Sequence, residues 1–254
     1  MSAALAFEWA KLRSVRSTWW CFAIAAFLQI TYAVLIGLDA RLDLEDDGGS
    51  NLLVVSDAGL LSLQFAQYAL IAVALLAVTS EYSTGTISTT LRAVPVRGRM
   101  LAAKSLVVGG AVAVAGAVLQ VAGAVVAGLI AGSAARWPIG DLAVDTLLAA
   151  VYAATLALFA LGLGAALRSA VGGLTAVLVI AVVLPTVLSR ITIGAVESVN
   201  DYLPGTAGVA AMYGAVSHVA EDQPYPPGAA VLVLACWAAA MVGAGYVVLR
   251  RRDA

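Results

Sequence analysis

Charged residues divide this chain into long uncharged stretches separated by short charged segments. Six stretches contain no Asp, Glu, Lys or Arg: 17–38, 58–80, 105–135, 146–167, 169–189 and 223–249. Each is as long as the ~20 apolar residues that a helix needs to cross the ~30 Å hydrocarbon layer of a bilayer. Lipid does not tolerate unpaired backbone groups, and none of the stretches alternates as barrel strands do. The sequence therefore predicts an all-α integral membrane protein with six transmembrane helices.

The signs of the charges differ between the two sides that these helices would separate. With both termini placed in the cytoplasm, eleven of the 14 basic residues lie inside and only Arg41, Arg136 and Arg190 lie outside. The 15 acidic residues divide the other way, with three inside and twelve outside. Because the distribution of Lys and Arg sets the orientation of membrane proteins, we expect a multi-pass protein with both termini in the cytoplasm.

The chain leaves no room for a separate soluble domain. It has 254 residues, of which 62% are hydrophobic, and the longest segment between spans is about 33 residues, 190–222. We expect a single transmembrane domain, 1–254, with a cytoplasmic loop at 81–104 and an extracellular segment at 191–228. The expected spans are about 17–38, 58–80, 105–132, 146–167, 170–190 and 229–249.

Two further segments have helical character without being spans. Residues 4–16 place Leu5, Trp9 and Leu12 on one helical face beside basic residues, which favours an N-terminal interfacial helix over an ordinary basic flank. Residues 202–220 are uncharged but interrupted by proline and glycine. A seventh crossing there would place the C-terminal arginines outside, so we expect a short extracellular re-entrant helix before the sixth span.

A few polar residues interrupt the apolar spans. Gln64 and Gln67 are three residues apart in the second span and share one helical face, and Gln120 lies in the third. Glutamine is unfavourable in lipid, so these side chains are expected to face the bundle interior. They either line a substrate cavity suited to an amphipathic compound or simply join helices. Pro185, near the outer end of the fifth span, predicts a kink.

The inventory of side chains argues against catalysis in this chain. There is a single histidine, His218, and the expected spans contain no carboxylate, which excludes an HExxH zinc site and an intramembrane aspartyl pair. The segment GRMLAAKS, 98–105, resembles a phosphate-binding loop but has Ala103 where the second glycine is required. We therefore expect no enzyme activity, no metal and no cofactor in this chain.

The segment between the second and third spans has a distinctive order of residues. Glu81 stands at the membrane exit, Gly85 and Thr86 follow, and Pro95 lies between basic residues. Since proline disfavours helix at the preceding residue, two short helices meeting at a bend are expected. A basic loop on the cytoplasmic side explains the arginines, but it explains neither the glutamate at the exit nor the proline.

This loop resembles the first cytoplasmic loop of ABC-2 type transporter permeases, in which the same features follow one another. The opening EWAKLRSVRSTWW, 8–20, and the ending YVVLRRRDA, 246–254, are also similar to those of bacterial members of the family. The resemblance implies a permease subunit in a bacterial plasma membrane that exports an amphipathic or hydrophobic substrate. It also implies residues that contact an ATPase, namely Glu81, Tyr82, Gly85, Thr86, Arg92, Pro95, Arg97, Arg99 and Lys104.

The same resemblance implies the partners. These are a separate cytoplasmic ABC ATPase, which would bind the ATP and Mg²⁺, and a second permease subunit, identical or not, with no nucleic acid involved. By the same analogy, charge reversal at Glu81 is expected to abolish transport without preventing expression or subunit pairing. The alternatives are a gradient-driven six-span carrier or channel and a non-transporting membrane scaffold. The lack of ionisable residues in the spans disfavours proton coupling, whereas sodium coupling through carbonyl and hydroxyl groups stays open.

Overall fold

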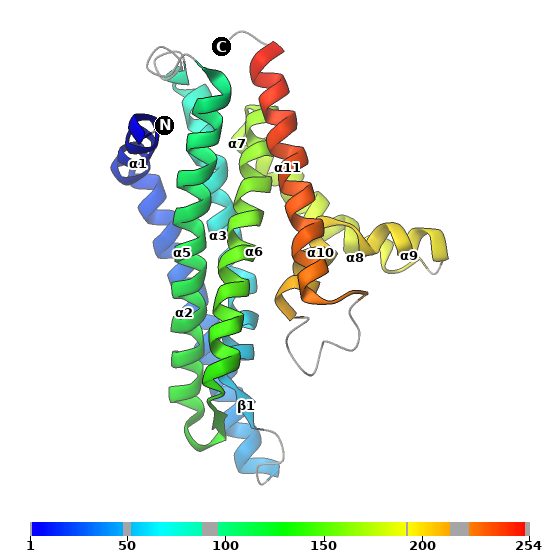
Figure 1. Cartoon of the computed structure of the whole chain (residues 1–254). Helices are drawn as coiled ribbons and strands as arrows, with labels where there is room; N and C mark the ends of the chain where they lie inside the picture. The colour runs from blue at the N-terminus through cyan, green and yellow to red at the C-terminus, as the bar shows by residue number, and fades with distance from the viewer. Residues whose placement is uncertain (1, 48–51, 88–95, 192, 214–223, 252–254) are drawn as a thin grey trace.

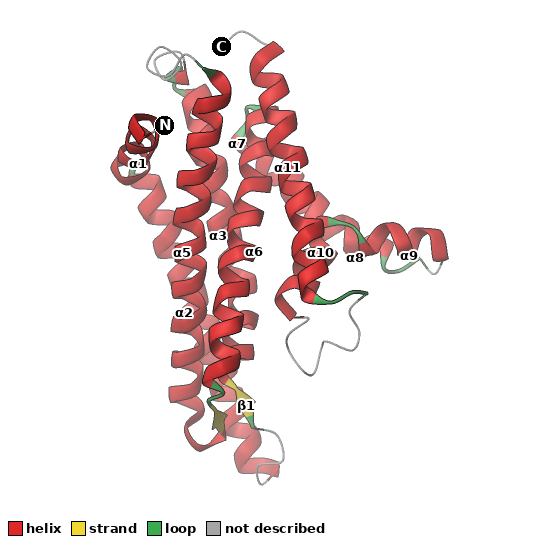
Figure 2. Ribbon diagram, in the orientation of Figure 1, coloured by secondary structure: helices red, strands yellow, loops and turns green. Residues whose placement is uncertain are grey.

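The computed structural model describes residues 2–47, 52–87, 96–191, 193–213 and 224–251. These residues are almost entirely helical (Figure 2), as the uncharged stretches predict. The helices are α1 Ser2–Ser14, α2 Arg16–Asp47, α3 Val55–Ser83, α5 Arg97–Ala131, α6 Ile139–Leu167, α7 Ala170–Leu178, η2 Val179–Val183, α8 Leu184–Leu188, α9 Gly194–Asp201, α10 Pro204–Tyr213 and α11 Pro227–Arg251. Two short strands, β1 Leu53–Val54 and β2 Ala135–Arg136, pair in parallel.

Six helical segments are long and apolar enough to cross a membrane, which confirms the predicted number of spans. They are Arg16–Leu44, Val55–Ser83, Arg97–Ala134, Ile139–Leu167, Ala170–Leu188 and Pro227–Arg251. The N-terminus and the end of α11 lie at the same end of the bundle (Figure 1), here named the terminal end. The direction in which this end faces across a membrane stays a prediction.

The core of the bundle is formed by α3 and α6, which pack against each other and are flanked by α2, α5 and α11. In the most apolar stretches of α3 and α6, 56% and 61% of the residues are buried within the chain. In the corresponding stretch of Ala170–Leu188 only 11% are buried. The apolar surface of Ala170–Leu188 is therefore left for lipid or for another protein to cover.

The fifth span is interrupted in the middle. A π-helical turn, η2, separates α7 from α8 directly before Pro185, and the chain then leads away from the bundle through α8 and α9 (Figure 1). Proline has no N–H, so the carbonyl of Ala181, four residues earlier, loses its helical donor. Gly205, in the first turn of α10, packs directly against that carbonyl, where a Cβ would collide with it. The interruption lies where the sequence predicts a kink.

Glycines allow α11 to approach α6 very closely. A Cβ added at Gly162 of α6 would overlap the backbone of Met241 and Val242, and one added at Gly245 would lie 2.8 Å from the carbonyl oxygen of Gly162. Small residues are the usual means of close helix packing in membranes, where hydrophobicity does not drive association. This crossing holds α11 against the central helices.

Candidate functional site: a buried ion-pair cluster at the terminal end

Three helices meet at the terminal end of the bundle through charged side chains. Glu8 lies on α1, Glu81 on the last turn of α3 and Lys104 on the second turn of α5. The chain breaks helical geometry at Val15, between α1 and α2, so α1 lies back against α5 (Figure 1). The residues that α1 buries are Ala4, Glu8 and Leu12, spaced four apart on one face.

Lys104 is the centre of this cluster. Its Nζ donates to Glu8 Oε2 at 2.6 Å, to Glu81 Oε1 at 2.6 Å and to the carbonyl of Ala77 at 3.2 Å. All three donors of the ammonium group are therefore used. Lys11 of α1 also donates to Glu81 Oε1. We name Glu8, Lys11, Glu81 and Lys104 the terminal cluster.

The terminal cluster is shielded from solvent at its centre. The side chain of Lys104 is 2% exposed, and those of Glu8 and Glu81 are nearly as buried, whereas Lys11 is 29% exposed. Buried charges are tolerated only where partners compensate the loss of hydration, and removing one partner is strongly destabilising. The cluster therefore fixes α1 and the ends of α3 and α5 as one unit. A cavity of about 310 Å³ adjoins it, lined among others by Ser80, Thr84 and Thr86.

The last turn of α3 has a second anchor, on α6. The guanidinium of Arg168 stands over the ring of Tyr82, 5.0 Å from the ring centroid. Arg168 itself has φ of 55° and ends α6 in the left-handed conformation, which permits the tight turn into α7. Beyond Tyr82 the chain leaves α3 through Gly85, whose φ of 70° favours glycine.

The first turn of α5 is held to the end of α11. Arg97 Nη1 donates to the carbonyl of Leu249 at 2.5 Å and to that of Arg250 at 3.4 Å. The last carbonyls of a helix lack intrahelical donors and carry partial negative charge, so a guanidinium stabilises them. Arg99, two residues further on, is exposed.

The predicted coupling residues thus fall into three groups. Glu81 and Lys104 are joined in the terminal cluster, while Tyr82 and Arg97 anchor the loop ends to α6 and α11. Gly85, Thr86 and Arg99 lie at the ends of the loop, where Thr86 lines the cavity beside the terminal cluster. The predicted residues Arg92 and Pro95 lie outside the described residues, as does His218. The segment 98–105 that resembles a phosphate loop is helical, and its lysine is bound to carboxylates.

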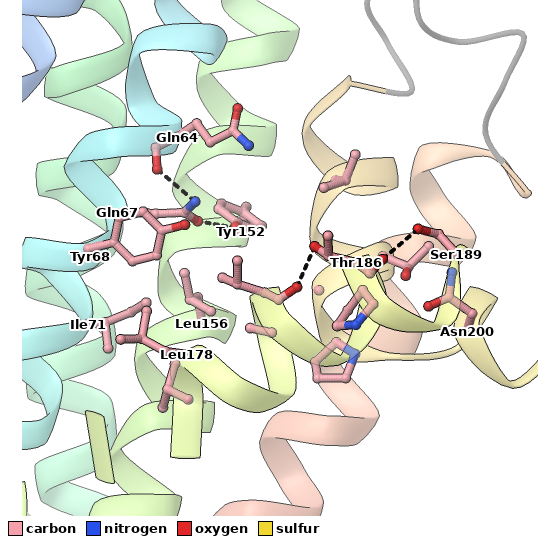
Figure 3. A pocket seen from close by; sticks show the side chains of 18 residues that line it. Gln64, Gln67, Tyr68, Ile71, Tyr152, Leu156, Leu178, Thr186, Ser189 and Asn200 are labelled. Carbon is pink, nitrogen blue, oxygen red and sulfur yellow. Dashed lines mark hydrogen bonds between the residues drawn. The ribbon is translucent and has the colours of Figure 1, made fainter. Parts of the chain in front are cut away.

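A second cavity lies between the central helices and the broken fifth span. It has a volume of about 420 Å³ and is bounded by α3, α6, η2, α8 and α10 (Figure 3). Gln64 and Gln67 line it, and Gln67 Nε2 donates to the Gln64 carbonyl at 2.8 Å. Tyr152 of α6 donates its hydroxyl proton to Gln67 Oε1. Thr186, Ser189 and Asn200 line the facing side of the cavity among apolar residues (Figure 3), so polar groups stand on two sides of a partly apolar surface.

Gln120 does not share this cavity. It is fully buried, and its Nε2 donates to the carbonyl of Ser56 at 2.9 Å, which joins α5 to the start of α3. Gln120 therefore joins helices, whereas Gln64 and Gln67 line the cavity and Gln67 also joins α3 to α6 through Tyr152. Gln29 of α2 has the same joining role through Gly59 and Ser62, and the rule that identified the other glutamines also applies to it.

The sequence did not identify several residues that contact the terminal cluster or the second cavity. The sequence places Glu8 and Lys11 only in an interfacial helix, although Glu8 is one of three acidic residues on the side with the basic excess. The apolar residues expected on one face of α1 do not share one environment, because Leu12 packs in the core while Trp9 is exposed. Nothing in the sequence marked Tyr152 as a cavity residue, since a single tyrosine in an apolar span can have many roles.

A comparison with known protein families identifies the family of this chain. The ABC-2 family transporter protein model matches residues 4–193, about three quarters of the chain. The match contains the whole terminal cluster and the α3 and α6 walls of the second cavity. No curated protein matches the chain. The chain therefore belongs to the ABC-2 family of transporter proteins and is a membrane permease of an ABC transporter.

Proposed function

We propose that this permease exports an amphipathic or hydrophobic substrate and is driven by a separate cytoplasmic ATPase that docks on the terminal end. The observation that carries the proposal is the terminal cluster. It ties both helices that flank the loop 81–104 to α1 through buried ion pairs centred on Lys104. In this orientation both termini face the cytoplasm, in agreement with the basic excess there.

The geometry provides a route for mechanical coupling. A force applied to the loop by an ATPase acts on the last turn of α3 and the first turn of α5. Glu81 and Lys104 make these turns one unit with α1, and Arg97 extends the connection to α11. Packed helices transmit displacement because their interiors are close-packed. The α3 helix then leads directly to Gln64 and Gln67 at the second cavity.

The ATPase contact predicts an effect of charge at an exposed loop residue. We expect Arg99→Glu to reduce recovery of the ATPase severalfold when the tagged permease is purified from native membranes in mild detergent. The copurified ATPase would be identified by mass spectrometry through its phosphate loop. Arg136→Glu, which reverses an exposed arginine on β2 at the opposite end, is the control and should leave recovery unchanged. Equal loss in both variants, or none in either, contradicts docking at the terminal end.

The second cavity is the proposed substrate site. Replacing Gln67 by Met together with Tyr152 by Phe removes two polar groups from the α3 and α6 side of the cavity, and folding is little affected because both partners of one hydrogen bond are lost together. We expect the apparent affinity for amphipathic dyes to change about fivefold, as one net hydrogen bond contributes ~1 kcal/mol. ATP-dependent dye accumulation in inverted membrane vesicles measures this. Tyr32→Phe, on α2 and outside the cavity, is the matched control. Unchanged affinity in the double variant would remove the cavity from the transport path.

A second permease subunit is part of the proposal. It is supported by the low burial of Ala170–Leu188, which leaves an apolar helix face uncovered by this chain. Purified permease alone in liposomes discriminates the alternative functions. Substrate movement under an ion gradient without any ATPase would indicate a carrier or channel. Recovery of neither an ATPase nor transport would indicate a scaffold.

A further inference from the structure

An apolar groove lies on the outside of the bundle, apart from the substrate cavity and the loop. It has a volume of about 620 Å³ and lies between α1, the first turns of α2 and the middle of α5. Its walls are almost entirely apolar, and among the described residues that line it Arg13 of α1 is the charged one. The principal apolar residues are Trp9, Leu12, Trp19, Phe22, Val114 and Val118. We name it the α1–α2–α5 groove.

The groove is open along a face that the described part of the chain does not cover. Val114 and Val118 of α5 are 65% and 61% exposed, and Trp19 of α2 is 58% exposed. Along α5 the groove extends from Gly110 to Leu119, roughly 13 Å at 1.5 Å per residue. A groove of this volume and length on a membrane-spanning helix can accept an acyl chain, and an empty apolar cavity against lipid would forfeit contacts on every wall.

The rim of the groove carries positive charge at the end where α1 meets α2. Arg13 lines the groove there, and Arg16 follows at the start of α2. Among the described residues, no salt bridge engages the guanidinium of Arg13. The indole of Trp19 donates to the backbone carbonyl of Arg13 at 2.9 Å, which fixes the tryptophan at the mouth. Tryptophan and arginine at this position are typical of the headgroup level of a membrane.

The charge at the rim selects among possible occupants. A second copy of this chain that bound through the same face would do so by two-fold symmetry and would bring two cationic rims together. An anionic phospholipid has the opposite charge at its headgroup and an apolar chain of the required shape. We propose that the α1–α2–α5 groove binds an anionic phospholipid, with one acyl chain along α5 and the phosphate at Arg13.

This site would act on α1 from the side opposite its ion pairs. Glu8 and Lys11 attach α1 to α3 and α5 through the terminal cluster, whereas Trp9 and Arg13 of the same helix face the groove. A bound lipid therefore stabilises the position of α1. The inference does not depend on an ATPase or on the identity of the substrate, so its failure would leave the proposed function standing.

Tryptophan fluorescence tests the proposal in the full chain. The permease is reconstituted in phosphatidylethanolamine vesicles that contain a small mole fraction of phosphatidylglycerol brominated on its acyl chains. Bromine quenches indole fluorescence on contact, and two groove residues, Trp9 and Trp19, are tryptophans. We expect quenching well above the bulk fraction of the brominated lipid, and much less when phosphatidylethanolamine carries the bromine.

Two variants and one control locate the signal. A Cβ at Gly110 meets no atom within 4 Å, so Gly110→Leu fills the groove without a clash and should abolish the excess quenching. Gly243→Leu is the control, because Gly243 is equally open on α11 and outside the groove. Arg13→Gln should weaken the preference for the anionic lipid about fivefold, as expected for one basic group at an anionic surface.

Three outcomes would overturn the proposal. They are quenching of the wild type in proportion to the bulk lipid fraction, equal loss in Gly110→Leu and Gly243→Leu, and an unchanged lipid preference in Arg13→Gln. Quenching below the bulk fraction would show that a protein partner covers the groove and would also overturn it.

Discussion

Replacing Lys104 with methionine is expected to lower the free energy of unfolding by about 3–5 kcal/mol, because it leaves buried charge without compensation. Glu8 and Glu81 share this one ammonium group. Their other oxygens, Glu8 Oε1 and Glu81 Oε2, have no hydrogen-bond partner among the described residues. Lys11 bonds to Glu81, whereas the salt bridge that Glu8 makes in the described part of the chain is to Lys104, so Glu8 would lose that counter-ion.

Thermal unfolding of the purified permease in detergent measures this effect. Lys11→Met serves as the control, since Lys11 contacts the same carboxylate from a partly exposed position and partly exposed pairs contribute little. We expect a large fall in the unfolding temperature for Lys104→Met and a small one for Lys11→Met. Equal, small losses would show that the terminal cluster does not hold these helices together.

A triple variant separates stability from coupling. Changing Glu8 and Glu81 to glutamine together with Lys104→Met removes all three buried charges, which is often neutral or stabilising compared with a buried ion pair. We expect stability to recover in this variant while transport stays low, because the cluster no longer makes α1, α3 and α5 one unit. Recovery of transport together with stability would limit the cluster to a structural role.

The structure also changes the expectation for charge reversal at Glu81. Its side chain is buried and bonded to both Lys104 and Lys11, so a third cation at this position would face two others at short range. Folding is therefore expected to fail along with transport, contrary to the expectation from the sequence. Glu81→Gln, which keeps the shape of the side chain, is the better probe of coupling.

Gly162→Val is the second change with a large expected effect, about 3 kcal/mol or more of lost stability. The added Cβ would overlap the backbone of Met241 and Val242 on α11, and a backbone cannot turn aside as a flexible side chain can. Helix α11 would have to move away from α6 as a unit. The ring contact between Phe159 and Trp237, with centroids 6.4 Å apart, would be lost with it.

The displacement of α11 can be followed through Trp237. Its indole donates to the carbonyl of Tyr202 at 2.8 Å, so its fluorescence reports on the packing of α11. We expect a shifted emission maximum and a lower unfolding temperature in Gly162→Val. Gly243→Val is the matched control, because Gly243 lies on α11 with open space around it. If the unfolding temperature of Gly243→Val fell as far as that of Gly162→Val, close packing of α11 on α6 could not be the cause.

The number of membrane-spanning helices and the family could both be predicted from the sequence. Each span must satisfy its backbone internally and exclude charge, so the uncharged stretches mark the helices without reference to one another. The motif around Glu81 and Lys104 also indicated the correct family, because the order of its residues can be recognised without knowing how the helices pack. The break before Pro185 could likewise be expected, because a missing N–H acts within one turn of helix.

Which polar groups meet depends on how the helices pack, and the sequence did not reveal it. Glu8 and Lys104 are 96 residues apart, and their pairing depends on how α1 lies against α5, which no local pattern encodes. Gln120 and Gln67 look alike in sequence, yet Gln120 is fully buried between helices and Gln67 lines a cavity, because each depends on which neighbour its helix face meets. The α1–α2–α5 groove likewise exists only where three helices leave a surface uncovered. Local chemistry determines the helices, whereas their mutual packing determines the sites between them.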